Sequence, residues 1–332
     1  MRKRIAVSTL AFVLSAAMLA AGAGSGFAAE AGYPKKPVTL ICQFTAGGST
    51  DLLARALAQN VTKYLGQPMV VENKPGASGT IGTDYVLKSK PDGYTLLTTS
   101  TGNFTSTPLI QNVPYDPEKD ARHIINIARH PIILVVNSES PWKSVEEFVN
   151  YVHANPGKLK YGQNAPGGTT HMAMEAFRKQ AKLDMKMVPY GGGASEVVTA
   201  LLGKHVDVGV VHPQEAKEFV ASGKLRPLVI FSKKRAKALP DVPTAIEKGY
   251  KVDIGVTKGI SAPAALPDDI AKILHDAFRK TMDDKDFLAA AKNTGDLDYL
   301  DYMDGKEITE FLVGMHNDLK PIIGELGLSK KK

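Results

Sequence analysis

Short runs of β-branched and apolar residues alternate with stretches of helical periodicity along most of the chain. Such alternation is typical of α/β proteins with parallel sheets. The first βαβαβ unit is expected over residues 37–99, with strands at Val38–Gln43, Met69–Glu72 and Tyr94–Thr99 and helices at 53–65 and Gly82–Ser89.

A second series with the same alternation begins at Ile132–Asn137. LPDVPTAIEKG (239–249) is expected to contain a short helix, and three further helices are expected from Pro267 to Leu319. Short extended stretches join the two series, and no flexible linker separates them. We therefore expect two lobes connected by crossing strands, with the ligand site in the cleft between the lobes.

The first residues have the composition of a secretory signal. Met1–Arg4 is basic, Ile5–Ala21 is apolar apart from a few hydroxyl residues, and small residues follow. This order predicts a signal peptide at 1–28, cleaved after Ala28 or alternatively after Ala31. The mature protein is then periplasmic or otherwise extracytoplasmic. A retained membrane anchor fits less well, because no stop-transfer charges follow the apolar run.

Charge and cysteine content argue against two further classes of protein. The formal net charge is +7, and loss of residues 1–28 removes three basic residues and leaves +4. The remaining lysines gather in SKKRAK (232–237) and at the end of the chain without interleaved aromatic residues, so nucleic-acid binding is not expected. Cys42 is the only cysteine, which excludes an intrachain disulfide, and the run VTLIC predicts a buried thiol.

FTAGGSTD (44–51) lies between the first strand and the first helix and contains no Lys, Arg or His. Gly47 and Gly48 permit positive φ and close approach of a ligand to the backbone. A helix start adds unpaired N–H groups and the positive end of the helix dipole, and Ser49 and Thr50 add hydroxyl donors. The Asp or Thr at the end of the segment is expected to cap the helix. The segment is either a cradle for a carboxylate or an ordinary strand-to-helix turn, and its spacing fits no nucleotide-binding motif.

APGGTTH (165–171) offers the same chemistry in the second series, between a strand and a helix start. Two such loops, one from each lobe, would hold one carboxylate from both sides. His171 is a candidate donor to the ligand, although a structural role at a helix end is the more frequent use of such a residue. YGGG (190–193) is a weaker third candidate, because tight packing explains it equally well.

No catalytic constellation is recognisable. The sequence has neither a G-x-S-x-G nor an H-E-x-x-H motif, and its eight histidines are scattered. Cys42 has no obvious His partner, and carboxylate pairs such as Asp268-Asp269 fall near expected helix ends. We therefore expect no enzyme activity, no cofactor and no metal site.

Several blocks of the sequence resemble, in the expected order, the periplasmic substrate-binding proteins of tripartite tricarboxylate transporters, the TctC or Bug family. Together they cover nearly all of the mature chain, and their order makes the resemblance specific. The blocks are YPKKPVTLICQFTAGGSTDLLAR, VVENKPGASGTIG, KPDGYTLL, YGQNAPGGTTH, VPYGGG, LLGKHVDVGVV, SGKLRPLVIFSKKR and LPDVPT.

The resemblance implies a type II periplasmic-binding-protein fold whose lobes close over a ligand. Residues 33–130 plus 255–332 are then expected in the first lobe and residues 131–254 in the second. It also implies a carboxylate ligand held by backbone N–H groups, hydroxyls and ordered water. The ligand-binding residues expected from the loops and the resemblance are Phe44, Thr45, Gly47, Gly48, Ser49, Thr50, Ser100, Gly168, Thr169, Thr170 and His171.

The sequence departs from the family pattern at three places. Thr45-Ala46 replaces the usual proline pair of the first loop, and His212 stands where many members carry an acidic residue. The second change favours a purely anionic ligand over an amino-bearing one. Lys258 stands in place of a more usual arginine. It meets a distal carboxylate if it faces the cleft, and otherwise it is an exposed edge-strand lysine.

The expected function is capture of a small organic carboxylate, namely a di- or tricarboxylate or an aromatic acid. The protein would deliver it to the membrane permease subunits of a tripartite tricarboxylate transporter. We expect a monomer that closes over its ligand like a Venus flytrap. The alternative is a sensing protein that presents carboxylate occupancy to a membrane signalling partner, since fold and pocket would be the same.

Overall fold

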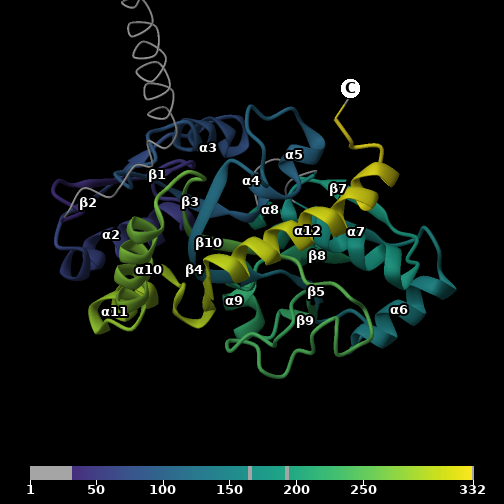
Figure 1. Ribbon diagram of the computed structural model, residues 1–332. Coiled ribbons are helices and arrows are strands. Elements are labelled where there is room, and N and C mark those ends of the chain that lie inside the picture. Colours follow the sequence, from purple (N-terminus) through teal and green to yellow (C-terminus); the bar gives the residue numbers. More distant parts are fainter. Residues whose placement is uncertain (1–31, 164–166, 191–193, 331–332) are drawn as a thin grey trace, which may run out of the picture.

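The computed structural model describes residues 32–163, 167–190 and 194–330 and contains two mixed β-sheets covered by helices (Figure 1). The first sheet has the order β11 (Leu300–Asp304), β4 (Ala121–Pro131), β10 (Gly255–Pro263), β3 (Thr95–Ser100), β1 (Val38–Cys42) and β2 (Met69–Asn73). The second has the order β7 (Lys186–Pro189), β6 (Lys160–Gln163), β8 (Val208–Val211), β5 (Ile133–Asn137) and β9 (Leu225–Ile230). The expected signal peptide lies outside the described residues.

Helices cover both faces of the first sheet. One face packs against α2 (Ser49–Leu65), α10 (Asp268–Met282) and α11 (Lys285–Thr294). The other face packs against α3 (Thr80–Leu87), α4 (Thr101–Phe104) and the first half of α12 (Gly305–Glu325). The short helix α5 (Thr107–Ile110) follows α4, and two 3₁₀ turns, η1 (Ala77–Gly79) and η2 (Leu297–Tyr299), complete this part.

The second sheet is covered in the same way. One face packs against α6 (Val145–Ala154), α7 (Thr169–Ala181) and the second half of α12. The other packs against α8 (Ala194–Leu202) and α9 (Pro213–Ala221). None of the helices in the described part of the chain has both the length and the apolar content that a membrane span requires.

The sheets are mixed, whereas parallel sheets were expected. β1 pairs in parallel with β2 and β3, and β6 pairs in parallel with β7 and β8, as the sequence predicts. β10, however, runs antiparallel to both β3 and β4, and β5 runs antiparallel to β8 and β9. β11 also runs antiparallel to β4. β4 and β10 run in opposite directions because β4 leads out of the first sheet into the second lobe and β10 leads back.

Three strands of the first sheet, β4, β10 and β11, were given no residue ranges by the sequence, which predicted only that crossing strands connect the lobes and that Lys258 lies on an edge strand or faces the cleft. β4 and β10 carry fully buried polar side chains such as Asn126, His130 and Lys258, so neither is a simple apolar run. Conversely, the short helix expected at 239–249 is absent, and Thr244 there makes an isolated parallel bridge to Ile230.

The two lobes are joined at three places. β4 ends at Pro131 and β5 begins at Ile133, so this crossing is almost direct. The chain returns from β9 to β10 through residues 231–254. The helix α12, yellow in Figure 1, runs along both lobes: Leu312 lies in the core of the first and Leu319 in that of the second. The division at 130/131 and 254/255 stays a prediction, and α12 contributes to both cores.

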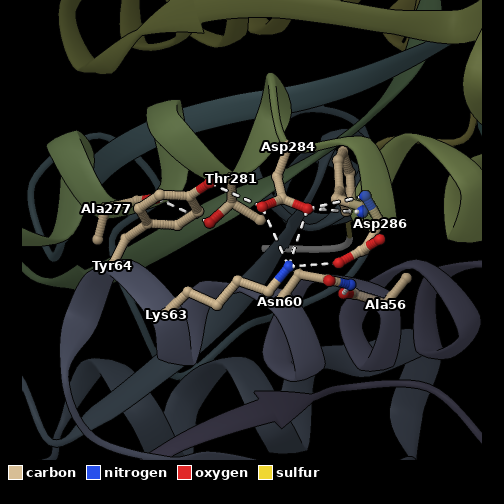
Figure 2. A network of polar contacts seen from close by, with 9 residues as sticks. Ala56, Asn60, Lys63, Tyr64, Ala277, Thr281, Asp284 and Asp286 are labelled. Carbon is tan, nitrogen blue, oxygen red and sulfur yellow. Dashed lines mark hydrogen bonds and ion pairs between the residues drawn. The ribbon is translucent and has the colours of Figure 1, made fainter.

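The C-terminal end of α2 is fixed to the start of α11 by a polar network (Figure 2). Nζ of Lys63 donates to Oδ1 of Asp284 (3.0 Å) and to Oδ2 of Asp286 (2.8 Å), and the hydroxyl of Tyr64 donates to Oδ2 of Asp284 (2.7 Å). Asp284 is also the N-cap of α11, since its carboxylate accepts the N–H of Phe287. The helix that begins at the first glycine-rich loop is therefore anchored within its own lobe.

Gly259→Ala is expected to destabilise the protein by about 1–3 kcal/mol, because close-packed backbone has no room for a methyl group. A methyl group at Gly259 would lie 2.3 Å from the main-chain oxygen of Ile125 on the neighbouring strand β4. Gly314→Ala in α12 is the matched control, since a methyl group there meets nothing within 4 Å. The control should gain up to about 1 kcal/mol from helix propensity. Urea unfolding measures both, and equal effects would contradict the close approach of β10 to β4.

Candidate ligand-binding site

The loop after β1 leads into a helix start that no side chain caps. Gly48 is the N-cap of α2 with an extended backbone (φ −72°, ψ 161°), and Gly47 before it has φ +80°. The latter value lies in the left-handed region that favours glycine. The expectation that Asp51 or Thr50 caps the helix is wrong, because the cap position is Gly48. The N–H groups of the first turn have no acceptor within the helix, so they are open to a ligand.

Asp51 braces the loop from within the first helical turn. Its side chain is 1% exposed. Oδ2 accepts the N–H of Gly47 (2.9 Å) and Nε of Arg55 (3.0 Å), and Oδ1 accepts Nδ2 of Asn73 (2.8 Å). Asn73 also donates to the main-chain oxygen of Phe44 (3.0 Å). Burial alone would raise the pKa of Asp51, but the donors from Arg55, Gly47 and Asn73 together hold it below its ordinary value.

The loop before α7 repeats this geometry in the second lobe. Gly167 has φ +81°, and Gly168 is an N-cap with φ −74° and ψ 173° and no side-chain cap. The N–H of Gly167 donates to Nδ1 of His171 (2.9 Å), just as the N–H of Gly47 donates to Asp51. GGSTD and GGTTH therefore fold alike. The first glycine is left-handed, the second is the N-cap, and the side chain of the fifth residue accepts the N–H of the first.

The side chain of His171 supports this loop by accepting a hydrogen bond from it, and its Nδ1 is not a donor for a ligand. Because Nδ1 accepts an N–H, the ring proton is on Nε2, which lies 3.8 Å from Oε1 of Glu175. Burial lowers the pKa of His171, although the charge of Glu175 opposes this effect. The ring is thus a neutral, buried support, and Nδ1 is occupied by the loop itself.

Ser100 lies between the two loops. It ends β3, is the N-cap of α4, and pairs in register with Lys258 of β10. Nζ of Lys258 donates to the main-chain oxygen of Ser49 in the first loop (3.2 Å). On the other side, a methyl group at Gly102 would lie 4.0 Å from Oγ1 of Thr169 in the second loop. The structure therefore brings both loops to one region around the end of β3.

The remaining candidate residues differ in exposure. Thr45 and Ser49 are exposed, while Phe44, Thr50, Gly168 and Thr169 are half-buried and Thr170 is buried. In the first loop Thr45 and Ser49 are thus the most exposed hydroxyl residues, and in the second loop Thr169 is more exposed than Thr170. Of the third candidate, YGGG, only Tyr190 belongs to the described residues.

Lys258 is not an exposed edge-strand lysine. It lies on β10 in the middle of the first sheet, its side chain is 5% exposed, and Nζ donates to Oδ1 of Asp296 (2.7 Å). Burial lowers the pKa of Lys258, and Asp296 opposes this effect. Nδ1 of His212 lies 3.1 Å from the main-chain oxygen of Pro131, so this ring is turned toward the connection between the lobes.

The structure adds residues that the sequence did not single out. Gln43 is fully buried and its Oε1 accepts the hydroxyl of Thr98, but its Nε2 has no hydrogen-bond partner in the described part of the protein. Next to it is the turn η1, where Ala77 and Ser78 have positive φ. Non-glycine residues in this conformation mark strain that often accompanies function. The only sequence signal was the block NKPGASG, whose glycines alone do not distinguish a site from a turn.

A cavity of about 670 Å³ lies away from these loops. It is lined by residues 232–237 after β9 and by β11 and α12 of the first lobe. Within the first sheet, β4 and β10 separate β11 from the ends of β1 and β3. None of the expected ligand-binding residues lines this cavity, so it is separate from the candidate site.

Two α/β lobes joined by crossing strands, with an uncapped helix start in each, define a two-lobed binding protein of the periplasmic type. A family model described as "Tripartite tricarboxylate transporter family receptor", TctC, matches residues 53–328. The chain belongs to this family, which confirms the resemblance stated above and the two-lobed fold that it implied.

Comparison with individual proteins agrees with this assignment. A relative from Cupriavidus necator, named "UPF0065 protein in gbd 5'region", is 37% identical over 325 residues, which cover 96% of this chain and 98% of the relative. A TctC solute-binding protein from Polaromonas, solved with no ligand, is 29% identical with a TM-score of 0.82, covering 89% of this chain and 100% of that one.

Two proteins from Rhodopseudomonas palustris were solved with organic acids. One, with adipate, is 27% identical with a TM-score of 0.71 and covers 90% of this chain and 100% of its own. The other, MatC with bound malate, is 26% identical with a TM-score of 0.67 and covers 88% and 100%. Solute-binding proteins of this fold therefore include binders of small carboxylates.

Asp51→Asn is expected to lower the free energy of unfolding by about 1–3 kcal/mol at neutral pH, since a buried charged acceptor of hydrogen bonds is lost. The folded-state pKa of Asp51 is lowered, so its contribution is present above the unfolded pKa of about 4 and is lost as pH falls below it. The difference between the wild type and the variant should shrink in that acid range. Urea unfolding at several pH values measures it, and a difference that does not depend on pH would contradict this role of the charge.

Proposed function

We propose that this protein is an exported solute-binding protein that captures a small organic carboxylate and delivers it to the permease of a tripartite tricarboxylate transporter. Membership of the TctC family supports the general role. The observation that carries the proposal is the pair of matched helix starts, one in each lobe, which both lack a side-chain cap.

Each helix start offers the chemistry that a carboxylate needs. The N–H groups of a first helical turn point at the same spot, and the helix dipole favours negative charge there. Hydroxyls of Ser49 and Thr169 add donors beside the two starts. Asp51 and His171 hold the loops in shape from behind, so they position the donors. The proposed ligand-contacting set is therefore Phe44, Thr45, Gly47, Gly48, Ser49, Thr50, Ser100, Gly168, Thr169 and Thr170, while His171 supports the second loop.

The ligands of related proteins narrow the class of acid. Adipate and malate, which are bound in two relatives of this fold, are both dicarboxylates. A ligand with two carboxylates has one charged end for each helix start, whereas a monocarboxylate must share its single group between them. We therefore propose a dicarboxylate as the preferred class, with tricarboxylates and aromatic acids as the other candidates.

Closure of the lobes completes the site in this proposal. At nearly the same sequence identity, the structure superposes better on the ligand-free relative (TM-score 0.82) than on the two acid-bound ones (0.71 and 0.67). This supports a lobe arrangement nearer to the ligand-free form. A ligand that contacts both lobes then favours the closed form by the extra contacts it makes there.

Export by cleavage after Ala28, a monomeric state and docking to permease subunits belong to the same proposal. The alternative is a sensing protein that presents carboxylate occupancy to a membrane signalling partner. The two differ in what fails when the gene is deleted. Loss of acid uptake by the cell supports transport, and intact uptake with lost transcriptional response supports sensing.

A thermal-shift screen of the mature protein should show stabilisation by one class of acid. A ligand at 100 times its dissociation constant stabilises by about 2.7 kcal/mol, which is a shift of a few degrees for a chain of this size. The panel contains malate, adipate, citrate, an aromatic acid and acetate, with a sugar and an amino acid as controls. A response to the sugar or the amino acid, with none to any acid, would refute carboxylate binding.

Ser49→Pro should reduce the affinity for the responding acid by about 10-fold or more, because one hydrogen bond to a charged group is lost. The backbone accepts this change. Proline is favoured at the first position of a helix, and Gly48 before it already has the extended conformation that a residue preceding proline prefers. Ser49→Ala is the matched control, since it removes the hydroxyl and keeps the N–H. Calorimetric affinities that are equal in the two variants would show that this N–H does not bind the ligand.

A further inference from the structure

A buried chain of hydrogen bonds runs from the second lobe to the first glycine-rich loop. It lies where β4 leaves the first sheet and β10 enters it. Its members, in spatial order, are Gln214 on α9, His130 on β4, Asp296 after α11, Lys258 on β10 and the main chain of Ser49 on α2.

The inner members of this chain are almost completely buried. The side chains of His130, Asp296 and Lys258 are 3%, 0% and 5% exposed. Nε2 of His130 and Nζ of Lys258 both lie 2.7 Å from Oδ1 of Asp296, and the hydroxyl of Thr294 donates to Oδ2 (2.7 Å). The carboxylate of Asp296 therefore has a donor on each oxygen, and Nε2 of His130 must carry a proton.

Gln214 is the link between the lobes. Its Nε2 donates to the main-chain oxygen of Gly295 (3.2 Å), and its Oε1 lies 2.9 Å from Nδ1 of His130. The oxygen of Gly295 can only accept, so the amide nitrogen must face it and the amide oxygen must face the ring. Turning the amide over would set its oxygen against that of Gly295. Both bonds of Gln214 exist together only when Nδ1 of His130 is also protonated.

The ring thus needs two protons to make every bond that the geometry offers. Burial is the largest influence on the pKa of His130 and lowers it, Asp296 raises it, and Lys258 and His212 lower it further. The remaining titratable group against the ring is Tyr299, whose centroid lies 4.8 Å away and whose pKa is raised to about 12, so it is uncharged. At neutral pH the ring is therefore neutral, and Nδ1, although 2.9 Å from Oε1 of Gln214, has no proton to donate to it.

We propose that a proton on Nδ1 of His130 joins the two lobes through Gln214, so that the lobe arrangement responds to pH. Protonation gives Gln214 its second bond to the first lobe, and by linkage the joined arrangement binds this proton more tightly than a separated one. Gln214 and His130 are positioning residues. The carboxylate of Asp296 that accepts from His130 also binds Lys258, which donates to Ser49. The link between the lobes is thus connected to the loop proposed to bind the ligand.

The first test follows the protonation of His130 in the ligand-free protein, and it does not depend on the proposed function. Side-chain ¹H–¹⁵N NMR of ¹⁵N-histidine protein is recorded from pH 8 to pH 4, with His130→Gln for assignment. Both nitrogens of His130 should become protonated with a midpoint below the ordinary value of about 6.5. Gln214→Leu should lower this midpoint by about one pH unit, because an acceptor of the charged ring is lost. Gln214→Glu should raise it by a similar amount, because a carboxylate then faces Nδ1.

Gln180→Leu is the matched control for the NMR test. Gln180 bonds both main-chain groups of Lys251 within the second lobe, so the same change of side chain there should leave the midpoint of His130 unmoved. A ring that stays neutral down to pH 4 in the folded protein would overturn the proposal. So would a midpoint that is the same in the wild type, Gln214→Leu and Gln214→Glu.

The second test measures the lobe arrangement directly. Cys42 is buried, so spin labels attach selectively to Tyr85→Cys on α3 and Met187→Cys on β7, one in each lobe, where the native side chains are exposed. The distribution of distances between the labels should narrow as pH falls through the midpoint of His130. With Gln214→Leu added it should be broad at every pH, and with Gln180→Leu it should behave as in the parent protein. If the distance distribution in the parent protein does not change with pH, the proposed link between the lobes through His130 and Gln214 is refuted, even if His130 titrates.

Discussion

The hydrogen bond from a left-handed glycine to the side chain four residues later is the constraint on which the candidate site depends. It turns each loop so that the second glycine, and not a polar side chain, occupies the N-cap. A Ser, Asp or Asn at that position would satisfy a first-turn N–H from within the chain. Because both lobes leave the position to glycine, neither N-cap residue supplies a side-chain acceptor to the first-turn N–H groups of its helix. A ligand carboxylate would thus do the work of a missing cap.

Position, and not residue type, decides what Asp51 and His171 do. One is an acid and the other a base, yet each uses a single acceptor atom to hold the N–H of the first glycine. Asp51 keeps its charge because Arg55 and Asn73 donate to it, whereas His171 does the same work as a neutral ring. The two loops can therefore have the same shape while their surroundings differ in charge. The fifth residue of the second loop is the neutral His171, so no carboxylate at that position repels an anion bound to this loop.

The sequence predicts the local parts of this structure well and the long-range parts poorly. Runs such as VTLIC and the helical stripe after it depend on neighbours in sequence, and the glycine pairs were visible as candidate loops. β4 and β10 were missed because their buried polar residues find partners far along the chain: His130 meets Asp296, and Lys258 meets both Asp296 and Ser49. No local pattern distinguishes such a lysine from an exposed one. The shared role of Asp51 and His171 was also invisible, since it is a property of backbone angles.

These buried polar residues occupy interior positions at which an apolar side chain would be less costly to bury. A charge in the interior is costly unless it is paired and hydrogen-bonded, and removing one partner costs more than the pair contributes. The strands that connect the lobes carry Lys258 and His130, and the single carboxylate of Asp296 neutralises one and orients the other. An apolar side chain at either position would pack as well but would make no directed bond to Ser49 or Gln214. The polar chain thus holds the first loop relative to the crossing strands, and in the proposed protonated state of His130 it also holds the second lobe.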